Sequence, residues 1–268
     1  MLYRPADLEP KKGRRSFLRL SLKAAGRLVW DFRAAILIVA VVLGLSFAVE
    51  MARESGVVSR DQLMASRTNL PGLVVSIFSH WDMTRFQENA QTLLFLAVIY
   101  PFTNFSQDRM ERVRRSSWFA LLVFPLAVIV NVLGIILSPT PSLGASGLVM
   151  AGLGIAFAFF SFNAVRGFGN LVALVRKEIN DPDKRRAALV DLWWLPWNAL
   201  LFVFFLFLLV FDRAALFGLG DPTINVGAHL VGFGMGFGLT ALLWDRMELR
   251  EGKLLRFGFK KRPKTRGE

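Results

Sequence analysis

The chain has 268 residues, of which 54% are hydrophobic and 25 are phenylalanine, and its formal net charge is +13. A soluble domain of this length could not hide so much apolar surface in one core, whereas a lipid bilayer accommodates it. A positive charge is also typical of nucleic-acid binding, but here the basic residues border apolar stretches and do not form one basic face. Composition therefore indicates an integral membrane protein with no nucleic-acid partner.

Six stretches are long and apolar enough to cross the bilayer, because about 30 Å of hydrocarbon takes about 20 helical residues. They lie at 34–52, 89–106, 118–137, 145–164, 192–211 and 225–244. None shows the alternation of a membrane β-barrel strand. The sequence thus predicts an all-α polytopic bundle of six transmembrane helices in one membrane domain, residues 34–244. A basic N-terminal segment, 1–33, reads either as an interfacial helix or as a solvated lead-in, and a basic tail covers 245–268.

The distribution of Lys and Arg predicts the orientation, since cytoplasmic loops retain positive charge during insertion. The N-terminal segment carries nine, the loop after the second span four, the loop after the fourth span six and the tail nine, which is 28 of the 33 basic residues. An even number of spans explains this excess on one side. We therefore expect a multi-pass protein of the cell membrane with both termini in the cytoplasm.

Two polar side chains stand near the starts of the fourth and sixth spans. Ser146 lies in the first turn of the fourth span, in the sequence Gly144-Ala145-Ser146-Gly147, and His229 lies about one turn into the sixth. Polar and ionisable groups are costly in lipid, so both are candidate functional residues. The predicted topology starts both spans on the non-cytoplasmic side, which puts Ser146 and His229 at one depth.

Small residues favour close packing of these two spans. The pairs at four-residue spacing are Gly232/Gly236 and Gly234/Gly238 in the sixth span, and Gly147/Ala151 and Gly154/Ala158 in the fourth. Such pairs let two helix backbones approach closely in a membrane. A close approach would allow a hydrogen bond between Ser146 and His229, the arrangement in which a histidine activates a serine nucleophile.

Asn89, the first residue of the predicted second span, shares that depth. Its amide can donate a hydrogen bond, as can the unpaired backbone N–H of Ser146 at a helix start. Such donors stabilise the oxyanion that forms when a serine attacks a carbonyl. Each residue also has a simpler interpretation: Ser146 as a small packing residue, His229 as a carbonyl-bonded or transporter histidine, and Asn89 as a helix cap.

Taken together, these motifs resemble those of the rhomboid intramembrane serine proteases, over all six spans. The matching segments are Gly144-Ala145-Ser146-Gly147, Ala228-His229-x-x-Gly232-x-x-x-Gly236, and Ser76-Ile77-Phe78-Ser79-His80 leading to Asn89. The resemblance implies that Ser146 is the nucleophile, His229 is the base of a dyad without an acid, and Asn89 holds the oxyanion. It also implies that single-span membrane proteins are cut near their outer ends without any cofactor, at a site open to the non-cytoplasmic side.

Two positions depart from the family pattern. Rhomboids often place a second histidine four residues before the asparagine, where this chain has Arg85, whose guanidinium donates with another geometry and a fixed charge. They also often carry a tyrosine one turn after the serine, where this chain has Met150. These departures motivate an alternative, a catalytically silent rhomboid-like protein that binds membrane clients. A metal site is not expected, because no span combines acidic residues and a histidine at ligand spacing.

Overall fold

The computed structural model describes residues 26–104, 109–137, 145–212, 214, 217 and 225–247. The six long helices are α2 (Arg33–Glu54), α5 (Met83–Thr103), α6 (Arg109–Leu137), α7 (Ser146–Val175), α8 (Pro182–Phe211) and α10 (Val226–Met247). Between α2 and α5 lie α3 (Arg60–Leu63), α4 (Gly72–Val75) and the 3-10 turn η2 (Ser76–Phe78). The described residues are therefore all-α, as predicted. The tail and most of the N-terminal segment, with its proposed interfacial helix, lie outside them.

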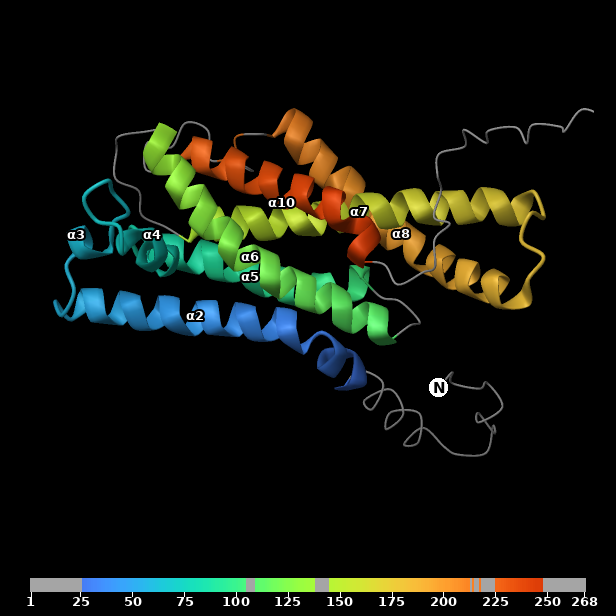
Figure 1. Cartoon of the computed structure of the whole chain (residues 1–268), viewed down its shortest axis with the longest axis horizontal. Coiled ribbons are helices and arrows are strands. Elements are labelled where there is room, and N and C mark those ends of the chain that lie inside the picture. The colour runs from blue at the N-terminus through green and yellow to red at the C-terminus, as the bar shows by residue number, and fades with distance from the viewer. Residues whose placement is uncertain are drawn as a thin grey trace, which may run out of the picture.

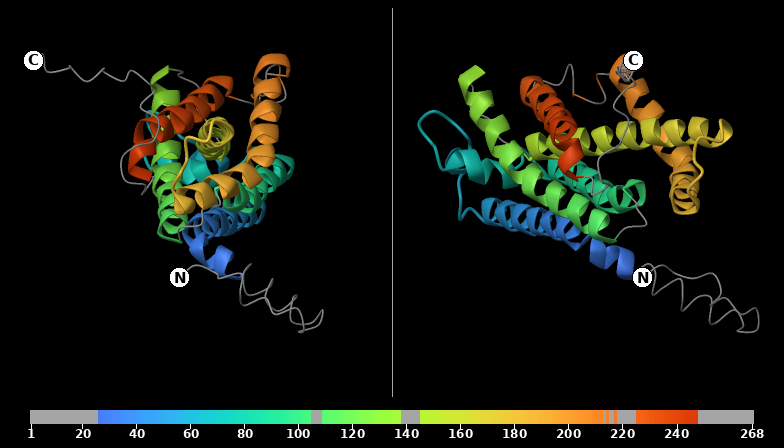
Figure 2. Two further views of the ribbon diagram at one scale, coloured as in Figure 1. Left: turned by 90° about the vertical axis from the view of Figure 1, so that its right-hand side faces the viewer. Right: turned by 45° about the vertical axis from the view of Figure 1, so that its right-hand side comes forward.

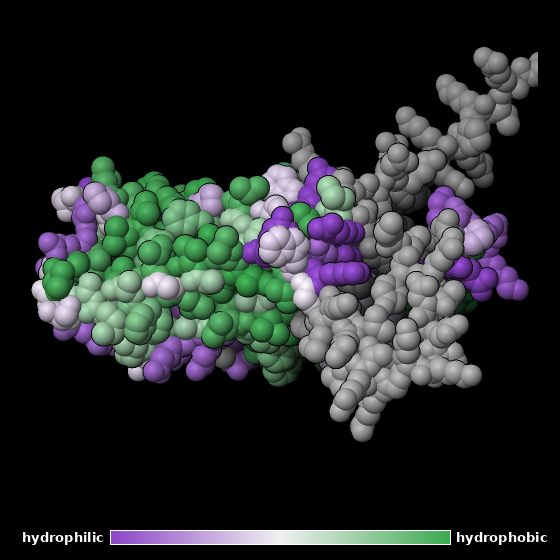
Figure 3. All heavy atoms as spheres, turned by 90° about the horizontal axis from the view of Figure 1, so that it is seen from below, coloured by the Kyte–Doolittle hydropathy of each residue, from purple (hydrophilic) through white to green (hydrophobic). Residues whose placement is uncertain are grey.

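Five of the long helices, α2, α6, α7, α8 and α10, are long and apolar enough to cross a membrane. The face seen from below is a broad apolar surface bordered by hydrophilic residues (Figure 3). The chain is thus a multi-pass membrane protein. The predicted second span corresponds to α5, which is not among these five. Its first two turns contain Arg85, Glu88 and Asn89, and these polar residues lower its hydropathy.

Most of the helices extend beyond the predicted spans. α6 begins at Arg109 and not near 118, α7 continues to Val175 and not 164, and α8 begins at Pro182 and not near 192. Hydropathy detects only the part of a helix that is apolar, whereas hydrogen bonding continues into the polar flanks. α5 likewise begins at Met83, where Asp82 caps it by accepting a hydrogen bond from the backbone N–H of Arg85 at 2.8 Å. Asn89 is therefore in the second turn of α5 and is not its first residue.

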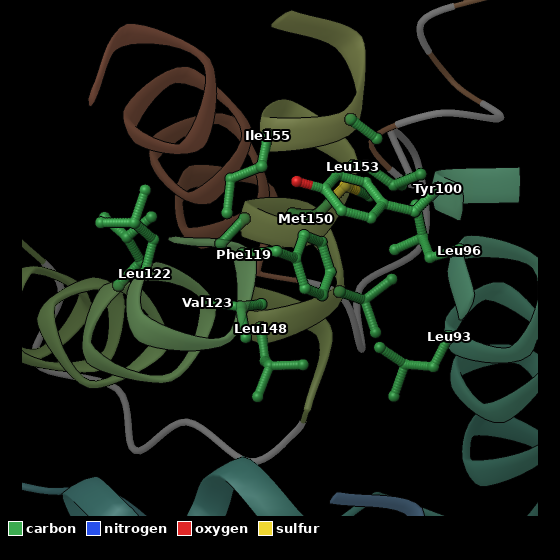
Figure 4. Packing of buried hydrophobic residues seen from close by; sticks show 14 of the residues in the cluster. Leu93, Leu96, Tyr100, Phe119, Leu122, Val123, Leu148, Met150, Leu153 and Ile155 are labelled. Carbon is green, nitrogen blue, oxygen red and sulfur yellow. The ribbon is translucent and has the colours of Figure 1, made fainter. Parts of the chain in front are cut away.

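Helix α7 forms the centre of the bundle. Nearly all residues of its first five turns are buried, and α5, α6, α8 and α10 pack around it (Figures 1 and 2). On the α5 and α6 side, the core is apolar: the rings of Tyr100 and Phe119 lie 4.6 Å apart, and Leu96 belongs to the same buried cluster (Figure 4). Gly and Ala make up much of the buried surface of α7, so neighbouring helices can approach its backbone.

The N-terminal end of α2 and the C-terminal end of α10 lie at the same end of the bundle. The backbone N–H of Ala35, near the start of α2, donates to the Ser116 hydroxyl at 3.0 Å. The adjacent Arg115 guanidinium lies 5.6 Å from the ring of Trp244, near the end of α10. We call this the basic end, because the basic segments at both termini are attached there. An even number of crossings requires this arrangement.

Buried ion pairs connect the helices at the basic end. Arg115 is fully buried, forms a pair with Glu111 one turn earlier, and lies over the rings of Phe159 and Trp244. Arg166 of α7 joins Glu111, at 3.8 Å, to Asp191 of α8, at 3.3 Å. Two carboxylates thus balance two guanidinium groups, which offsets much of the cost of burying them.

The first turn of α7 lies well inside the bundle. A Cβ on Gly147 would lie 3.0 Å from Val130 Cγ1, so the start of α7 is level with Val130 of the antiparallel helix α6. Helix α6 continues seven residues further, to Leu137, which is about 10 Å at 1.5 Å per residue. Figure 1 shows the same arrangement, with α2 and α6 extending past the start of α7. Ser146 is therefore recessed from the end of the bundle opposite the basic end.

Candidate active site

Helices α7 and α10 touch backbone to backbone through small residues. A Cβ on Gly236 would collide with the carbonyl oxygen of Ala151, and one on Gly154 would collide with that of Phe233. A Cβ on Gly232 would lie 2.9 Å from the carbonyl oxygen of Gly147. The expected side-by-side packing of these helices is confirmed. Gly234 and Gly238, by contrast, have open space at their Cβ positions, so that pair does not face α7.

The register of this packing determines the relative depth of the two candidate residues. Gly232 lies against Gly147, and Gly236 lies against Ala151, so α7 and α10 run parallel. His229 precedes Gly232 by three residues, which puts it within about 3 Å of Ser146 along the axis at 1.5 Å per residue. The sequence-based expectation that both residues lie at one depth agrees with this register.

The two side chains also lie on the facing sides of their helices. The Cβ of Met150 is 3.2 Å from the Cβ position of Gly232, and Ser146 precedes Met150 by four residues, one turn along the same face. His229 precedes Gly232 by three residues and Gly236 by seven, so it shares their face as well. Ser146 and His229 therefore belong to the helix faces through which α7 and α10 touch.

No hydrogen bond joins the two side chains in the described part of the chain. His229 is 6% exposed, Ser146 is half-buried, and the buried Nδ1 of His229 has no hydrogen-bond partner among the described residues. The predicted Ser–His hydrogen bond is thus not formed in this conformation. Catalytic hydrogen bonds are often long without substrate and shorten in the complex. Gly144, which precedes this site, lies outside the described residues.

Asn89 belongs to the buried stripe of α5, at the level of Ser146. It shares one helix face with Leu93, Leu96 and Tyr100, all of which are buried. Leu96 Cδ1 lies 3.0 Å from the Cβ position of Gly152 in α7. Helices α5 and α7 run parallel, so the residues seven positions before Leu96 and Gly152 are also level with each other. These are the half-buried Asn89 and residue 145. The depth expected for Asn89 agrees with this register, although its start-of-helix position was wrong.

Arg85 lies one turn before Asn89, in the first turn of α5. Its Nη1 donates to the Glu88 carboxylate at 2.8 Å, and its side chain is 27% exposed. Arg85 shares one face of α5 with Asn89, four residues later, so its positive charge lies on the same side of this helix as Asn89. The residue at the second oxyanion position is thus near the site but is already engaged by an acidic neighbour.

Phe217 is a site residue that was not predicted. Its side chain is 4% exposed and packs edge-on to Phe233, with ring centroids 5.9 Å apart, and its backbone lies beside the His229 imidazole. Phe233 follows His229 by one turn, so Phe217 covers the same face of α10. No local pattern marks this residue, because the contact depends on how the chain after α8 returns to α10.

Glu50 and His80 form a second buried polar group near the start of α5. Glu50 is fully buried, and its Oε1 accepts the backbone N–H of His80 at 2.7 Å. The His80 Nδ1 lies 3.5 Å from the same oxygen, and the ring packs edge-on to Phe86 at 5.4 Å. Among the described residues, neither ring nitrogen of His80 makes a hydrogen bond.

The buried His80 makes stability depend on pH. Burial, with a smaller contribution from the Arg53 charge, lowers the pKa of His80 from 6.5 to about 4, which Asp82 only partly opposes. Between those values the unfolded chain binds a proton that the folded chain does not, so stability falls as pH drops below 6.5. At pH 5 the loss is about 2 kcal/mol, from 1.5 pKa units at about 1.4 kcal/mol each.

This pH effect can be measured by thermal unfolding in detergent. We expect the Tm of the wild-type protein to fall between pH 7.5 and pH 5, and the fall to be smaller in His80→Gln. His229 is present in both proteins, so their difference isolates His80. Equal pH profiles for the two proteins would show that His80 does not titrate in this range.

The five apolar helices define the protein as a multi-pass α-helical membrane protein. No family model matches the chain, and neither the curated proteins nor the solved structures contain a match. The described residues contain no cluster of His, Cys, Asp or Glu that could hold a metal ion.

Proposed function

We propose that the protein is an intramembrane serine endopeptidase, similar to the rhomboids, that cleaves single-span membrane proteins. The observation that supports this most strongly is the register of α7 and α10, in which Ser146 and His229 share one depth on facing helix sides. Packing by small residues alone does not require a serine and a histidine at these two positions.

In the proposed reaction, Ser146 Oγ attacks the carbonyl carbon of the scissile peptide bond while His229 takes its proton. The tetrahedral intermediate collapses as the C–N bond breaks, and His229 returns the proton to the leaving amine. A water molecule then attacks the acyl ester, with His229 again as the base, and releases the second product and free Ser146. No cofactor or metal ion takes part.

Three groups are suited to stabilise the oxyanion. The backbone N–H of Ser146 is at the first residue of α7, where helix N–H groups lack intrahelical partners and the helix dipole is positive. The amide of Asn89 is level with Ser146 on the neighbouring helix α5. Arg85 adds positive charge one turn away, and its ion pair with Glu88 would have to rearrange before it could donate directly. Donors in a site with little water stabilise an anion strongly.

The recessed position of Ser146 suits a substrate that is itself a membrane helix. Cleavage requires a substrate carbonyl that is released from the hydrogen bonds of its helix. Residues near the end of a substrate helix meet this requirement most easily. A serine about 10 Å below the end of α6 is at a depth that such residues can reach. With α5 as a sixth crossing and the basic end in the cytoplasm, this site opens to the non-cytoplasmic side of the cell membrane.

A catalytically silent protein that binds membrane clients is the second candidate. The missing hydrogen bond between Ser146 and His229, and the engagement of Arg85 by Glu88, favour it. Such a protein would use the same bundle and the same recess without any chemistry. Retention of both a serine and a histidine at the matching depth favours the protease.

A fluorophosphonate probe separates the two candidates, because it labels only a serine that is activated as a nucleophile. We expect labelling of the wild-type protein in detergent and strongly reduced labelling of His229→Ala, since the base is lost. His80→Ala, at the other histidine, serves as the control and is expected to keep the label. Equal labelling of wild-type protein and His229→Ala would contradict an activated Ser146 and favour the silent client-binding protein.

A further inference from the structure

The carboxylate of Glu50, near the end of α2, is fully buried. Its Oε1 accepts the backbone N–H of His80 at 2.7 Å, and its Oε2 pairs with Arg53 at 2.6 Å. A buried charge is costly unless it is paired and hydrogen-bonded. One oxygen thus accepts a hydrogen bond and the other is ion-paired, and the hydrogen bond reaches a residue 30 positions further along the chain. The contact between Glu50 and His80 therefore ties the chain before α5 to α2.

Neighbouring contacts strengthen the same connection. Arg53 donates to the carbonyl oxygen of Trp81 at 3.0 Å, and so does Arg60, whose guanidinium lies 5.1 Å from the centre of the Trp81 ring. Phe86, in the first turn of α5, packs on the ring of His80 at 5.4 Å and on Phe47 of α2 at 6.3 Å. The last residues before α5 are thus held to α2 by charge-assisted hydrogen bonds and aromatic packing.

This connection is next to the residues proposed to stabilise the oxyanion. Asp82, directly after Trp81, caps α5, and Arg85 and Asn89 follow within its first two turns. Further along, α2 and α5 meet through apolar contacts such as Phe32 and Tyr100, which constrain sliding along the axis less than directional hydrogen bonds do. The contacts of Glu50 and Arg53 therefore attach the start of α5 to α2 by directional bonds.

We propose that Glu50 is a positioning residue for the oxyanion donors: it holds the chain before α5 so that Asn89 and Arg85 stay level with Ser146. The proposal rests on the proposed function, since it assumes that Asn89 acts on the oxyanion of a serine protease reaction. Glu50 itself does not touch the substrate, because it binds the His80 backbone on the α2 side of α5.

The kinetic test compares Glu50→Ala with Glu50→Gln, which keeps an acceptor for the His80 N–H. In proteoliposomes with a single-span reporter, we expect Glu50→Ala to lower kcat by about 10²-fold with little change in KM, as for loss of an oxyanion donor. Glu50→Gln should restore most of kcat. In the Asn89→Ala background, Glu50→Ala should cost much less, because both changes act on one interaction. Glu54→Ala, exposed and one turn along the same helix, is the matched control.

A structural readout keeps this inference separate from the protease proposal. The chain has no cysteine, so Thr84→Cys, at an exposed site in the first turn of α5, can carry a single spin label. We expect a more mobile label in Glu50→Ala and an unchanged one in Glu54→Ala. If Glu50→Ala does not fold, Arg53→Gln removes one of the two bonds to Trp81 and the ion pair with Glu50, and is expected to mobilise the label in the same direction.

The outcomes are distinct. An immobile label in the folded Glu50 and Arg53 variants overturns the positioning role, as does an additive loss of kcat in the Asn89→Ala background. A mobile label in a protein whose wild type cleaves no reporter supports the connection to α2 but contradicts the protease.

Discussion

Ser146→Ala is expected to lower cleavage of a single-span reporter by at least about 10³-fold, because the attacking oxygen is removed while the rest of the site remains. The change deletes one hydroxyl group from a half-buried position that makes no hydrogen bond with other described residues. Stability should therefore change little. The measurement is the initial rate of cleavage in proteoliposomes, with the Tm of each variant recorded alongside.

Ser161→Ala is the matched control for this prediction. Ser161 is in the same helix, and its hydroxyl donates to the carbonyl oxygen of Phe157 at 2.8 Å, a local bond within α7. We expect its cleavage rate to stay within about twofold of the wild type, since this bond only supplements the helical ladder. Cleavage that persists in Ser146→Ala would show that another group, or another protein in the preparation, is the nucleophile.

Gly236→Ala is expected to reduce both stability and activity. The added Cβ would collide with the carbonyl oxygen of Ala151, a backbone atom that cannot rotate away, so α7 and α10 must separate. Overpacking of this kind costs about 1–3 kcal/mol, and a clash with a backbone atom belongs to the upper part of this range, above the gain of about 1 kcal/mol from replacing glycine in a helix. Because Ser146 and His229 are on these two helices, a shift of about 1 Å should lower activity by about 10²-fold.

The same helix supplies the control for the Gly236 prediction. Gly234 and Gly238 have open space at their Cβ positions, so Gly234→Ala and Gly238→Ala are expected to leave activity unchanged and to keep or raise the Tm. Unfolding in detergent and reporter cleavage measure both effects. If all three alanine variants behaved alike, close contact between α7 and α10 at Gly236 would be contradicted.

Hydropathy and basic-residue counts predicted much of the membrane architecture. The all-α class follows from the length of the apolar stretches, because an isolated span must satisfy its backbone hydrogen bonds internally. The start of α2 and the end of α10 lie at one end of the bundle, which agrees with the even number of spans that the Lys and Arg counts require. The helix boundaries were less predictable, as α5 shows: its cap at Asp82 lies in a polar stretch that hydropathy does not detect.

The candidate site was partly predictable from sequence. Small residues at four-residue spacing indicated that the fourth and sixth spans pack closely, and Ser146 was expected at the helix start where α7 begins. The spacing did not distinguish Gly232 and Gly236, which face α7, from Gly234 and Gly238, which do not. Both pairs satisfy the same one-dimensional pattern, and only the rotation of α10 against α7 separates them.

By itself, then, the sequence determined the properties that depend on local composition: a multi-pass helical protein, its candidate serine and histidine, and the residues that allow close helix packing. The tertiary structure alone decided which faces meet, that Ser146 and His229 make no hydrogen bond in this conformation, and that Glu50 holds the chain before α5. The reason is physical. Hydropathy and charge are properties of local sequence. The orientation of helix faces, their register and the long-range hydrogen bonds arise only when helices distant in sequence pack together.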